Sequence, residues 1–455
     1  MTVDKTVGYD NMKADSIKAV VRELEAQGVR YVRLAYSDMH GYPRGKDIPL
    51  EYFESVAEKG QSFCSANLVD GLASNPLIAP GMAPERGYPD MHIIPDLSTL
   101  VPVPWEPDTV QCLADIYDEE GNPVEFSPRN FLKRVIRLFE TELKLKPVFA
   151  HELEFYLLKN SEGKWEKYSN HLSMVYTVGT RSDELGILRR FLESGNAMGL
   201  RLTAANHEIG GGQFEINMMH GEALDAADRA FRFKHMIKEV AHRHGLHATF
   251  MGKPFNDEPG SGFHVHMSLY NEEGQNVFYD PSEKDQLSET FKHFIGGLIE
   301  HAPALMLFLA PTINSYKRLV PDSLVPLHAN WGYDNRTTFI RVPGDRGAGT
   351  RFELRLGDAA ANPYLVSGAI LLAGYIGLKY KKEPGDPLQG DASGIGTALP
   401  NSLEKSIEAL LSDSTMCGLI GAPMVDAFTG MKRVEFERFR QYVTDWEFNE
   451  YVYHL

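Results

Sequence analysis

The stretch His151-Glu152-Leu153-Glu154-Phe155-Tyr156-Leu157 decides the fold, because its carboxylates alternate with apolar side chains. A period of two is typical of a β-strand, and it puts Glu152 and Glu154 on the same face. Two carboxylates this close repel one another unless a cation or a proton neutralises them. Oxygen ligands of this kind suit hard divalent cations such as Mg²⁺. Taken alone, however, the stretch is also explained by a solvated strand face.

Three further segments carry related side chains and favour a site over a solvated face. Residues 208–215 read Glu-Ile-Gly-Gly-Gly-Gln-Phe-Glu, so a glycine-rich turn separates two more carboxylates. Residues 260–268 read Gly-Ser-Gly-Phe-His-Val-His-Met-Ser, with two histidines and a serine on one strand face. Residues 351–355 read Arg-Phe-Glu-Leu-Arg, with an acid between two arginines. Five carboxylates and one or two histidines predict a site for several metal ions, and the arginines suit phosphate or carboxylate groups.

Outward from these segments, the chain alternates predicted strands with long helices, which indicates an α+β fold. Helices are predicted from apolar spacing and cap residues at 15–28, 126–145, 183–198, 222–244, 288–301 and 436–453. The first third is richer in short strands and turns, and it forms a small mixed unit. We therefore expect two domains, a small one at 15–108 and a large catalytic one at 109–455.

Composition excludes several classes of protein. Of the 455 residues, 43% are hydrophobic and 11% aromatic, which excludes wholesale disorder. The net charge of −16 makes a general nucleic-acid binder a poor interpretation, because phosphate affinity needs clustered Lys and Arg. The acidity would suit a cationic substrate, but it is also explained by a solvated acidic surface. The motifs GxxxxGK[ST] and GxGxxG are absent, so a P-loop or Rossmann nucleotide site lacks support.

The cysteines and the apolar stretches predict a cytoplasmic protein. Cys64, Cys112 and Cys417 form an odd, sparse set without CxxC, which argues for a reducing compartment. No basic and apolar leader follows Met1, so no signal peptide is expected. The uncharged stretch 359–378 contains Asn, Pro and several Gly and Ala residues. It therefore predicts a buried helix, and we expect no contact with a membrane.

Together these segments resemble the type I glutamine synthetase family. Further segments carry the likeness, namely Lys253-Pro254, Asn314-Ser315-Tyr316-Lys317-Arg318-Leu319, Asn335-Arg336-Thr337 and Ala360-Ala361-Asn362-Pro363-Tyr364. The resemblance implies a small N-terminal β-grasp domain and a large catalytic domain with a curved antiparallel sheet and flanking helices. It also implies a homo-oligomer, a hexameric ring usually stacked as a dodecamer, with active sites between neighbouring subunits.

The resemblance implies a reaction and its cofactors. ATP would phosphorylate the side-chain carboxylate of L-glutamate, and an amine would displace the phosphate to form an amide. Two or three Mg²⁺ or Mn²⁺ ions would assist, because phosphoryl transfer depends on positioning and charge neutralisation. The residues that match the ligands of one ion are Glu154, Glu208 and Glu215. Those that match the ligands of the second ion are Glu152, His264 and Glu353.

The resemblance also assigns residues to the nucleotide and to glutamate. His266, Ser268 and Arg351 match residues near the ATP phosphates. Arg341 matches a catalytic residue that meets the transferred phosphoryl group. Residues that match glutamate or phosphate contacts are Arg318, Arg336 and Arg355, with Gly260 in the glutamate loop.

Two departures from glutamine synthetase concern the amine. Leu324 lies in the flap 321–326, where the family carries a Glu that helps bind ammonium and takes its proton. Leucine can do neither, although it can still exclude water from an acyl phosphate. Cys64 lies at the position of an Asp that also contacts ammonium from the neighbouring subunit. Losing both carboxylates weakens binding of a small hydrated cation and makes room for carbon.

The chain accordingly resembles the γ-glutamylamine ligase branch, above all γ-glutamylputrescine or γ-glutamylpolyamine synthetases. A monoamine would meet an apolar pocket of Leu324, Trp331 and Tyr176. A diamine needs an acid for its distal ammonium, and the candidates by position are Asp70, Asp322 and Asp334. Two alternatives stay open, an ordinary glutamine synthetase that uses ammonium and a non-catalytic structural or regulatory homologue. The second predicts damaged metal ligands, whereas all six are present.

Overall fold

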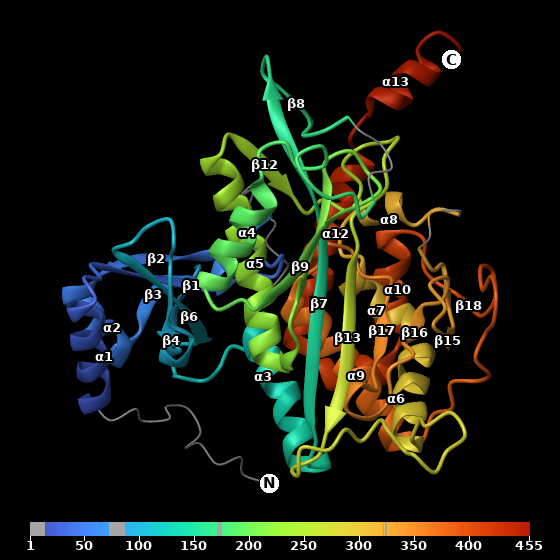
Figure 1. Ribbon diagram of the computed structural model, residues 1–455, viewed down its shortest axis with the longest axis horizontal. Helices are drawn as coiled ribbons and strands as arrows, with labels where there is room; N and C mark the ends of the chain where they lie inside the picture. Colours follow the sequence, from blue (N-terminus) through green and yellow to red (C-terminus); the bar gives the residue numbers. More distant parts are fainter. Residues whose placement is uncertain (1–13, 72–86, 171–174, 322, 324) are drawn as a thin grey trace.

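The computed structural model describes residues 14–71, 87–170, 175–321, 323 and 325–455. A small N-terminal domain lies to one side of a large one (Figure 1). Its six-stranded sheet has the order β2-β1-β6-β4-β3, with β5 paired to β6. The strands are β1 (Tyr31–Ser37), β2 (Pro43–Pro49), β3 (Gln61–Cys64), β4 (Asp90–Pro95), β5 (Val101–Pro102) and β6 (Thr109–Tyr117). Helices α1 (Ala14–Ala26) and α2 (Leu50–Lys59) contact each other, and α2 packs on the sheet.

The position of strand β6 affects where the boundary between the two domains is placed. It runs parallel to β1, with Thr109 opposite Tyr31, and antiparallel to β4. Because β6 lies between β1 and β4, the sheet would lose its centre if the small domain stopped at residue 108. We therefore propose that the small domain extends to Tyr117. The more specific β-grasp topology stays a prediction.

The large domain is built on a ten-stranded sheet whose longest strand, β7 (Lys146–Ser161), pairs with five others. The order is β15-β16-β17-β13-β7-β10-β9, and β8, β11 and β12 also pair with β7. The remaining strands are β8 (Lys164–Lys167), β9 (Leu202–His207), β10 (Gln213–Met218), β11 (Gly221–Glu222), β12 (Leu246–Thr249), β13 (Phe263–Tyr270), β15 (Trp331–Tyr333), β16 (Ile340–Val342) and β17 (Phe352–Leu354). A separate short pair joins β14 (His328–Ala329) to β18 (Thr397–Ala398). The predicted α+β class is confirmed.

One face of the sheet is covered by helices because β7 presents apolar side chains to it. Leu153, Phe155 and Leu157 are fully buried, and the Phe155 ring packs against aromatic rings of α4 and α5. Helix α9 lies in the core against α3, α5 and α6. The helices are α3 (Pro128–Leu138), α4 (Ile187–Ala197), α5 (Ala223–Arg243), α6 (Glu289–Glu300), α7 (Ala302–Leu309), α8 (Ser315–Arg318), α9 (Pro363–Tyr380), α10 (Leu403–Ser412), α11 (Ser414–Ile420), α12 (Ala422–Arg440) and α13 (Asp445–Tyr451).

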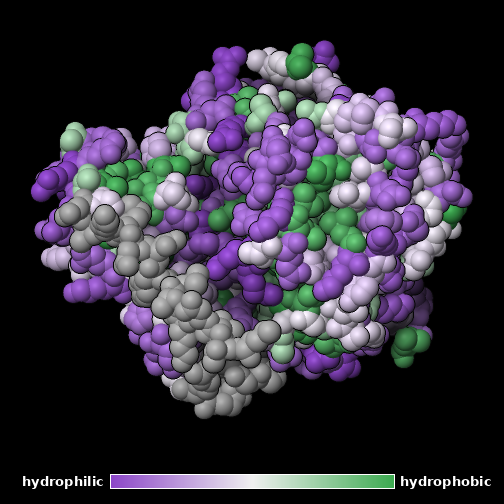
Figure 2. All heavy atoms as spheres, turned by 90° about the horizontal axis from the view of Figure 1, so that it is seen from below, coloured by the Kyte–Doolittle hydropathy of each residue, from purple (hydrophilic) through white to green (hydrophobic). Residues whose placement is uncertain are grey.

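The uncharged stretch 359–378 forms most of α9, as expected. Residues 363–377 are buried inside the large domain. Among the residues that the structure describes, no helix combines the length and the apolar character needed to cross a membrane. Seen from below, hydrophilic side chains cover much of the molecule, and hydrophobic ones gather in patches between them (Figure 2).

The prediction of one final helix at 436–453 was wrong. Helix α12 ends at Arg440, and α13 begins only at Asp445. A capping box causes the restart, since the Thr444 hydroxyl accepts from the Glu447 backbone N–H while the Glu447 carboxylate accepts from the Thr444 N–H. Helix α13 therefore projects from the body of the large domain (Figure 1).

Candidate active site

Cross-strand register gathers the predicted ligands on the face of the sheet opposite the helices. On β7, Glu152 lies opposite His264 of β13, and Glu154 lies opposite Glu215 of β10. Farther across, His266 pairs with Glu353 of β17. Residues directly opposite in antiparallel strands share a face, so four strands supply one cluster.

The cluster contains two groups compact enough to hold a cation. One is Glu152, His266 and Glu353, and the other is Glu152, Glu215 and His264; within each, the ligand atoms lie within 4.8 Å of one another. The His266 Nε2 atom is 3.1 Å from Glu152 Oε1. The His264 Nδ1 atom is 3.6 Å from Glu152 Oε2 and 3.7 Å from Glu353 Oε1. Carboxylate oxygens with imidazole nitrogens suit Mg²⁺ or Mn²⁺, so the side chains present fit the implied metals.

Electrostatics also favour a cation at this face. Burial and the neighbouring Glu154 carboxylate raise the pKa of Glu208 to about 8. Burial and the carboxylates of Glu152 and Glu154 raise the pKa of Glu215 to about 8. Carboxyl groups that crowd in this way must bind protons or cations at neutral pH. A divalent ion would let all of them ionise.

Hydrogen bonds position Glu154 and Glu208. The Glu154 Oε2 atom accepts from the backbone N–H of Gly262 at 2.8 Å and from Gln213 Nε2 at 3.1 Å. The Glu208 Oε1 atom accepts from Asn206 Nδ2 at 2.8 Å. Neither carboxylate belongs to the two compact groups. His266, expected near the nucleotide, is instead within reach of two predicted metal ligands.

Arginines border the cluster around Glu353, which is 1% exposed. The Arg341 Nη1 atom donates to Glu353 Oε2 at 2.7 Å, and Arg355 donates to the other oxygen. Burial alone would raise the pKa of Glu353, but His264 and Arg355 outweigh it and lower the pKa. Arg351 extends the row, since its Nε atom is 3.3 Å from His266 Nδ1. Two positive charges thus hold Glu353 ionised beside the histidines.

Arg318 lies on the other side of the cluster and is nearly buried. Its Nη1 atom donates to the Leu356 carbonyl at 2.7 Å, whereas Nε has no partner among the described residues. A methyl group added at Gly262 would lie 3.0 Å from Arg318 Nη2, 3.1 Å from Glu154 Oε1 and 3.3 Å from His264 Nε2. The missing side chain at Gly262 therefore lets a guanidinium, a carboxylate and an imidazole converge. A substrate carboxylate placed there would meet Arg318.

Comparisons with known proteins agree with this geometry. Residues 125–451 match the family model described as glutamine synthetase, catalytic domain. The chain belongs to the glutamine synthetase family. It is 33% identical over 453 residues to a glutamine synthetase of Halobacterium salinarum, covering 96% of this chain and 97% of that protein. This family member is a carbon–nitrogen ligase.

The chain is also similar in sequence to a ligase that uses an organic amine, and in structure to a solved protein. The chain is 36% identical over 452 residues to a glutamate–isopropylamine ligase of a Pseudomonas species, covering 94% of this chain and 96% of that protein. A solved structure described as "Apo GmaS without ligand" matches with a TM-score of 0.85 at 32% identity, covering 95% of this chain and 99% of that one. The fold of the whole chain is therefore of the glutamine synthetase type.

Several predicted site residues lie away from the cluster. Trp331 lies opposite Ile340 in β16, so it points to the other face of the sheet from Arg341; it is 3% exposed and its Nε1–H donates to the Gly385 carbonyl at 2.9 Å. Tyr176 is 67% exposed beside the end of β9, where its N–H donates to the His207 carbonyl. Arg336 is exposed in the turn before β16. The aromatic rings of Trp331 and Tyr176 therefore do not line the metal cluster, as the predicted amine pocket would require.

Other predicted residues stand at the edges of the site. Leu324 lies outside the described residues. Ser268 is buried on β13, and its hydroxyl donates to the Thr350 carbonyl at 2.8 Å. Gly260 packs against Arg318, because a Cβ there would lie 2.5 Å from Arg318 Cγ, and its carbonyl accepts from Gln213 Nε2.

Sequence reasoning missed the support for the glycine loop. Glu258 is 2% exposed; its carboxylate accepts from Lys167 and, at 3.0 Å, from the Gly211 N–H. The phenol of Tyr156 donates to the Pro259 carbonyl at 2.8 Å. An acid directly before Pro-Gly was the only available signal for Glu258. Lys167 carries no periodic signal, since it lies in a short hairpin strand.

Raising the pH is expected to destabilise the metal-free protein. Glu208 and Glu215 keep their protons in the folded state up to about pH 8, whereas the ordinary pKa is 4.5. The folded state thus binds more protons in this window, so the stability from these groups is complete below pH 4.5 and is lost as the pH rises to about 8. In EDTA, we expect the melting temperature to fall by roughly a few degrees across the window, and Mn²⁺ to restore it at the upper end.

Glu215→Gln is the matched variant, because it removes one titrating group and keeps the shape of the side chain. Its melting temperature in EDTA should fall less steeply with pH. A slope equal to that of the unaltered protein would show that Glu215 does not titrate in this window.

Proposed function

We propose that the protein is an ATP-dependent ligase that joins the γ-carboxylate of L-glutamate to an organic amine. In the first step, a side-chain oxygen of glutamate attacks the γ-phosphorus of ATP, and ADP leaves. In the second, the amine nitrogen attacks the acyl carbon of γ-glutamyl phosphate, phosphate leaves and the nitrogen loses a proton. The products are a γ-glutamylamide, ADP and phosphate.

The side chains at the site would divide this work. Arg318 and Arg355 would hold the negative groups of glutamate, and the loop at Gly260 would close over it. Arg341 would neutralise the phosphoryl group in transit. Divalent ions held by the six predicted ligands would supply further positive charge to the phosphates. His266, Ser268 and Arg351 would border the nucleotide.

The observation that carries the organic amine is the loss of both ammonium-binding carboxylates. The resemblance places Leu324 and Cys64 where glutamine synthetases have acids, and the carboxylates that match metal ligands are all present in the sequence. The similarity to a glutamate–isopropylamine ligase supports the same substrate class. Of the acids considered for the distal ammonium of a diamine, Asp334 already pairs with Arg341 through Oδ1 at 2.6 Å, and Asp322 lies outside the described residues.

A second candidate function is ordinary glutamine synthesis from ammonium. The similarity to a glutamine synthetase favours it. Phosphate release measured with purified protein, ATP, Mg²⁺, glutamate and single amines separates the two. The panel contains ammonium, methylamine, isopropylamine, ethanolamine, an aromatic amine, putrescine and spermidine. Higher kcat/KM with an organic amine than with ammonium is expected; the reverse order would contradict the proposal.

We also propose a homo-oligomer, with a dodecamer of two hexameric rings and intersubunit sites as its form. Helix α13 supports this, because it projects from the body of the large domain (Figure 1) and carries exposed aromatic side chains. Trp446 and Phe448 on α13 are 65% and 60% exposed, and Tyr453, just after the helix, is 90% exposed. Such a surface is best covered by another subunit. The three free cysteines support a cytoplasmic location.

A further inference from the structure

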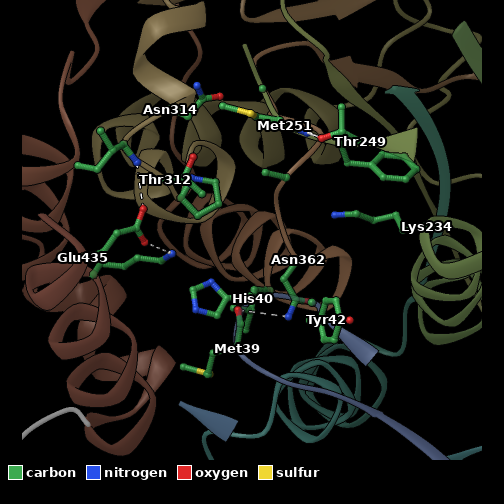
Figure 3. Close-up of a pocket in the computed structure, with 18 of the residues that line it drawn as sticks. Met39, His40, Tyr42, Lys234, Thr249, Met251, Thr312, Asn314, Asn362 and Glu435 are labelled. Atoms are coloured by element: carbon green, nitrogen blue, oxygen red, sulfur yellow. Dashed lines mark hydrogen bonds and ion pairs between the residues drawn. The ribbon is translucent and has the colours of Figure 1, made fainter. Parts of the chain in front are cut away.

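A cavity of about 1000 Å³ lies where the small domain meets the large one. Its walls come from the turn between β1 and β2, from α5, from residues 249–252 and from α12 (Figure 3). None of the described residues that line it belongs to the sets assigned above to metal, nucleotide or glutamate. It is therefore a separate space from the candidate active site.

The cavity carries an excess of positive charge. Two acidic side chains, Glu239 and Glu435, line it together with five basic ones, Lys234, Lys238, Lys317, Lys432 and Arg438. The charge of Glu435 is already neutralised by Lys432, since Lys432 Nζ lies 2.9 Å from Glu435 Oε2. The net charge of the protein is −16, so this basic cavity contrasts with the chain as a whole and would attract an anion.

Lys234 and Lys238 are neighbouring lysines of the cavity that have no carboxylate partner among the described residues. They lie one helical turn apart on α5, so their side chains project from the same side of that helix. Lys234 is 7% exposed, and its Nζ atom donates to the Ala361 carbonyl at 3.1 Å. Within the part of the chain that the structure describes, neither ammonium has a carboxylate within 4.0 Å. Figure 3 shows Lys234 reaching into the cavity from the side opposite Glu435.

Among the residues that the structure describes, the Phe250 ring lies against both ammonium groups, and the Tyr42 ring lies 5.8 Å from Lys238 Nζ. Lys234 Nζ is 5.4 Å from the centre of the Phe250 ring, and Lys238 Nζ is 5.9 Å from it. A ring offsets part of the cost of removing a cation from water, but it does not cancel two charges. Burial, followed by repulsion from Lys238, lowers the pKa of Lys234 to about 7. Lys234 is therefore only partly protonated at neutral pH, and a neighbouring anion would favour its charged form.

The apolar side chains that line the cavity indicate what the uncharged part of such a ligand would be. Phe308, Leu365 and Phe428 are buried and line the cavity. The body of a ligand in this cavity would therefore contact aliphatic and aromatic groups. His40 adds a buried Nε2 atom that has no hydrogen-bond partner among the described residues. The chemistry of the cavity therefore combines cationic donors with an apolar floor.

We propose that this cavity binds a small organic anion, with a carboxylate between Lys234 and Lys238 and an apolar body over Phe250 and Phe428. The proposal goes beyond the ligase reaction and does not depend on it. The cavity also adjoins the glutamate loop, because the carbonyl of Gly252, in its wall, accepts from the Ser261 N–H at 2.8 Å. Saturating glutamate in every measurement keeps the probe out of the glutamate site.

Isothermal titration calorimetry of the full-length protein with 4-phenylbutyrate tests the proposal, and 4-phenylbutanamide is the uncharged control. We expect one site per chain, with the amide bound at least about tenfold more weakly. Lys238→Met should weaken binding of the carboxylate by about tenfold or more. Lys405→Met, on the exposed face of α10, should change it by less than about twofold.

Three results would overturn the proposal. They are the absence of binding up to about 10 mM, equal affinity for the acid and the amide, and unchanged affinity in both Lys238→Met and Lys234→Met. The second variant matters because Lys234 is the more buried of the two, and a melting curve shows whether it folds. Since binding is measured as heat, loss of ligase activity would not mimic any of these results.

Discussion

Glu353→Gln is expected to lower phosphate release by about 1000-fold with every amine, which corresponds to about 4 kcal/mol of transition-state stabilisation. Glu353 is the point where the metal side and the arginine side of the site meet. Its two oxygens accept from Arg341 and Arg355, and one lies 3.7 Å from His264 Nδ1. Glutamine keeps the size of the side chain and removes the charge on which all three neighbours depend.

The measurement is kcat for phosphate release in Glu353→Gln, with Mg²⁺ varied up to saturation. Glu166→Gln, on the exposed strand β8, is the matched control and should retain its activity. A melting curve and a sedimentation profile exclude misfolding of the variant. Activity within about tenfold of the unaltered protein would show that Glu353 is not a ligand in the reaction.

Leu324→Glu is expected to raise the use of ammonium relative to an organic amine by at least about tenfold in kcat/KM. The substitution would place a carboxylate where the resemblance to glutamine synthetases predicts an ammonium-binding acid. A carboxylate would attract the small hydrated cation and give its proton an acceptor. It would also bring a charge close to the alkyl group of a larger amine, which would disfavour that substrate.

Leu324→Met separates the effect of charge from that of shape, because methionine stays apolar and similar in volume. Its ratio of ammonium to organic-amine use should match that of the unaltered protein. An unchanged ratio in Leu324→Glu would mean that residue 324 does not face the amine.

Much of the site could be predicted from sequence because five of the six predicted ligands lie in strands with a period of two, and Glu208 directly follows β9. That period places Glu152 with Glu154 and His264 with His266, whatever strands they meet. It does not state register. The structure supplies it, with Glu154 opposite Glu215 and His264 opposite Glu152. Register depends on how whole strands pack, so a single segment cannot reveal it.

The role of His266 and the placement of Trp331 were harder to predict from the sequence. His266 lies within a possible metal group because β17 brings Glu353 opposite it. Trp331 precedes a glycine in a very short strand, where no alternation tells which face the ring takes. The ring packs on Tyr333 instead, away from the carboxylates.

The fold was predictable where local signals are strong. The buried helix at 359–378 lacks charge over its whole length, and a cap at Asn362 with Pro363 marks its start. The end of the chain was missed because residues 436–453 keep helical composition across the break. Only the pairing of Thr444 with Glu447 signals that a new helix begins there.

The central claim is that an organic amine, and not ammonium, is the second substrate. A competition in one tube tests it most directly: protein, ATP, Mg²⁺ and L-glutamate with equal concentrations of ammonium and the panel amines, and products quantified by mass spectrometry. We predict that a γ-glutamylamide of an organic amine exceeds glutamine by about tenfold or more. Glutamine as the main product would contradict the proposed function and leave an ordinary glutamine synthetase.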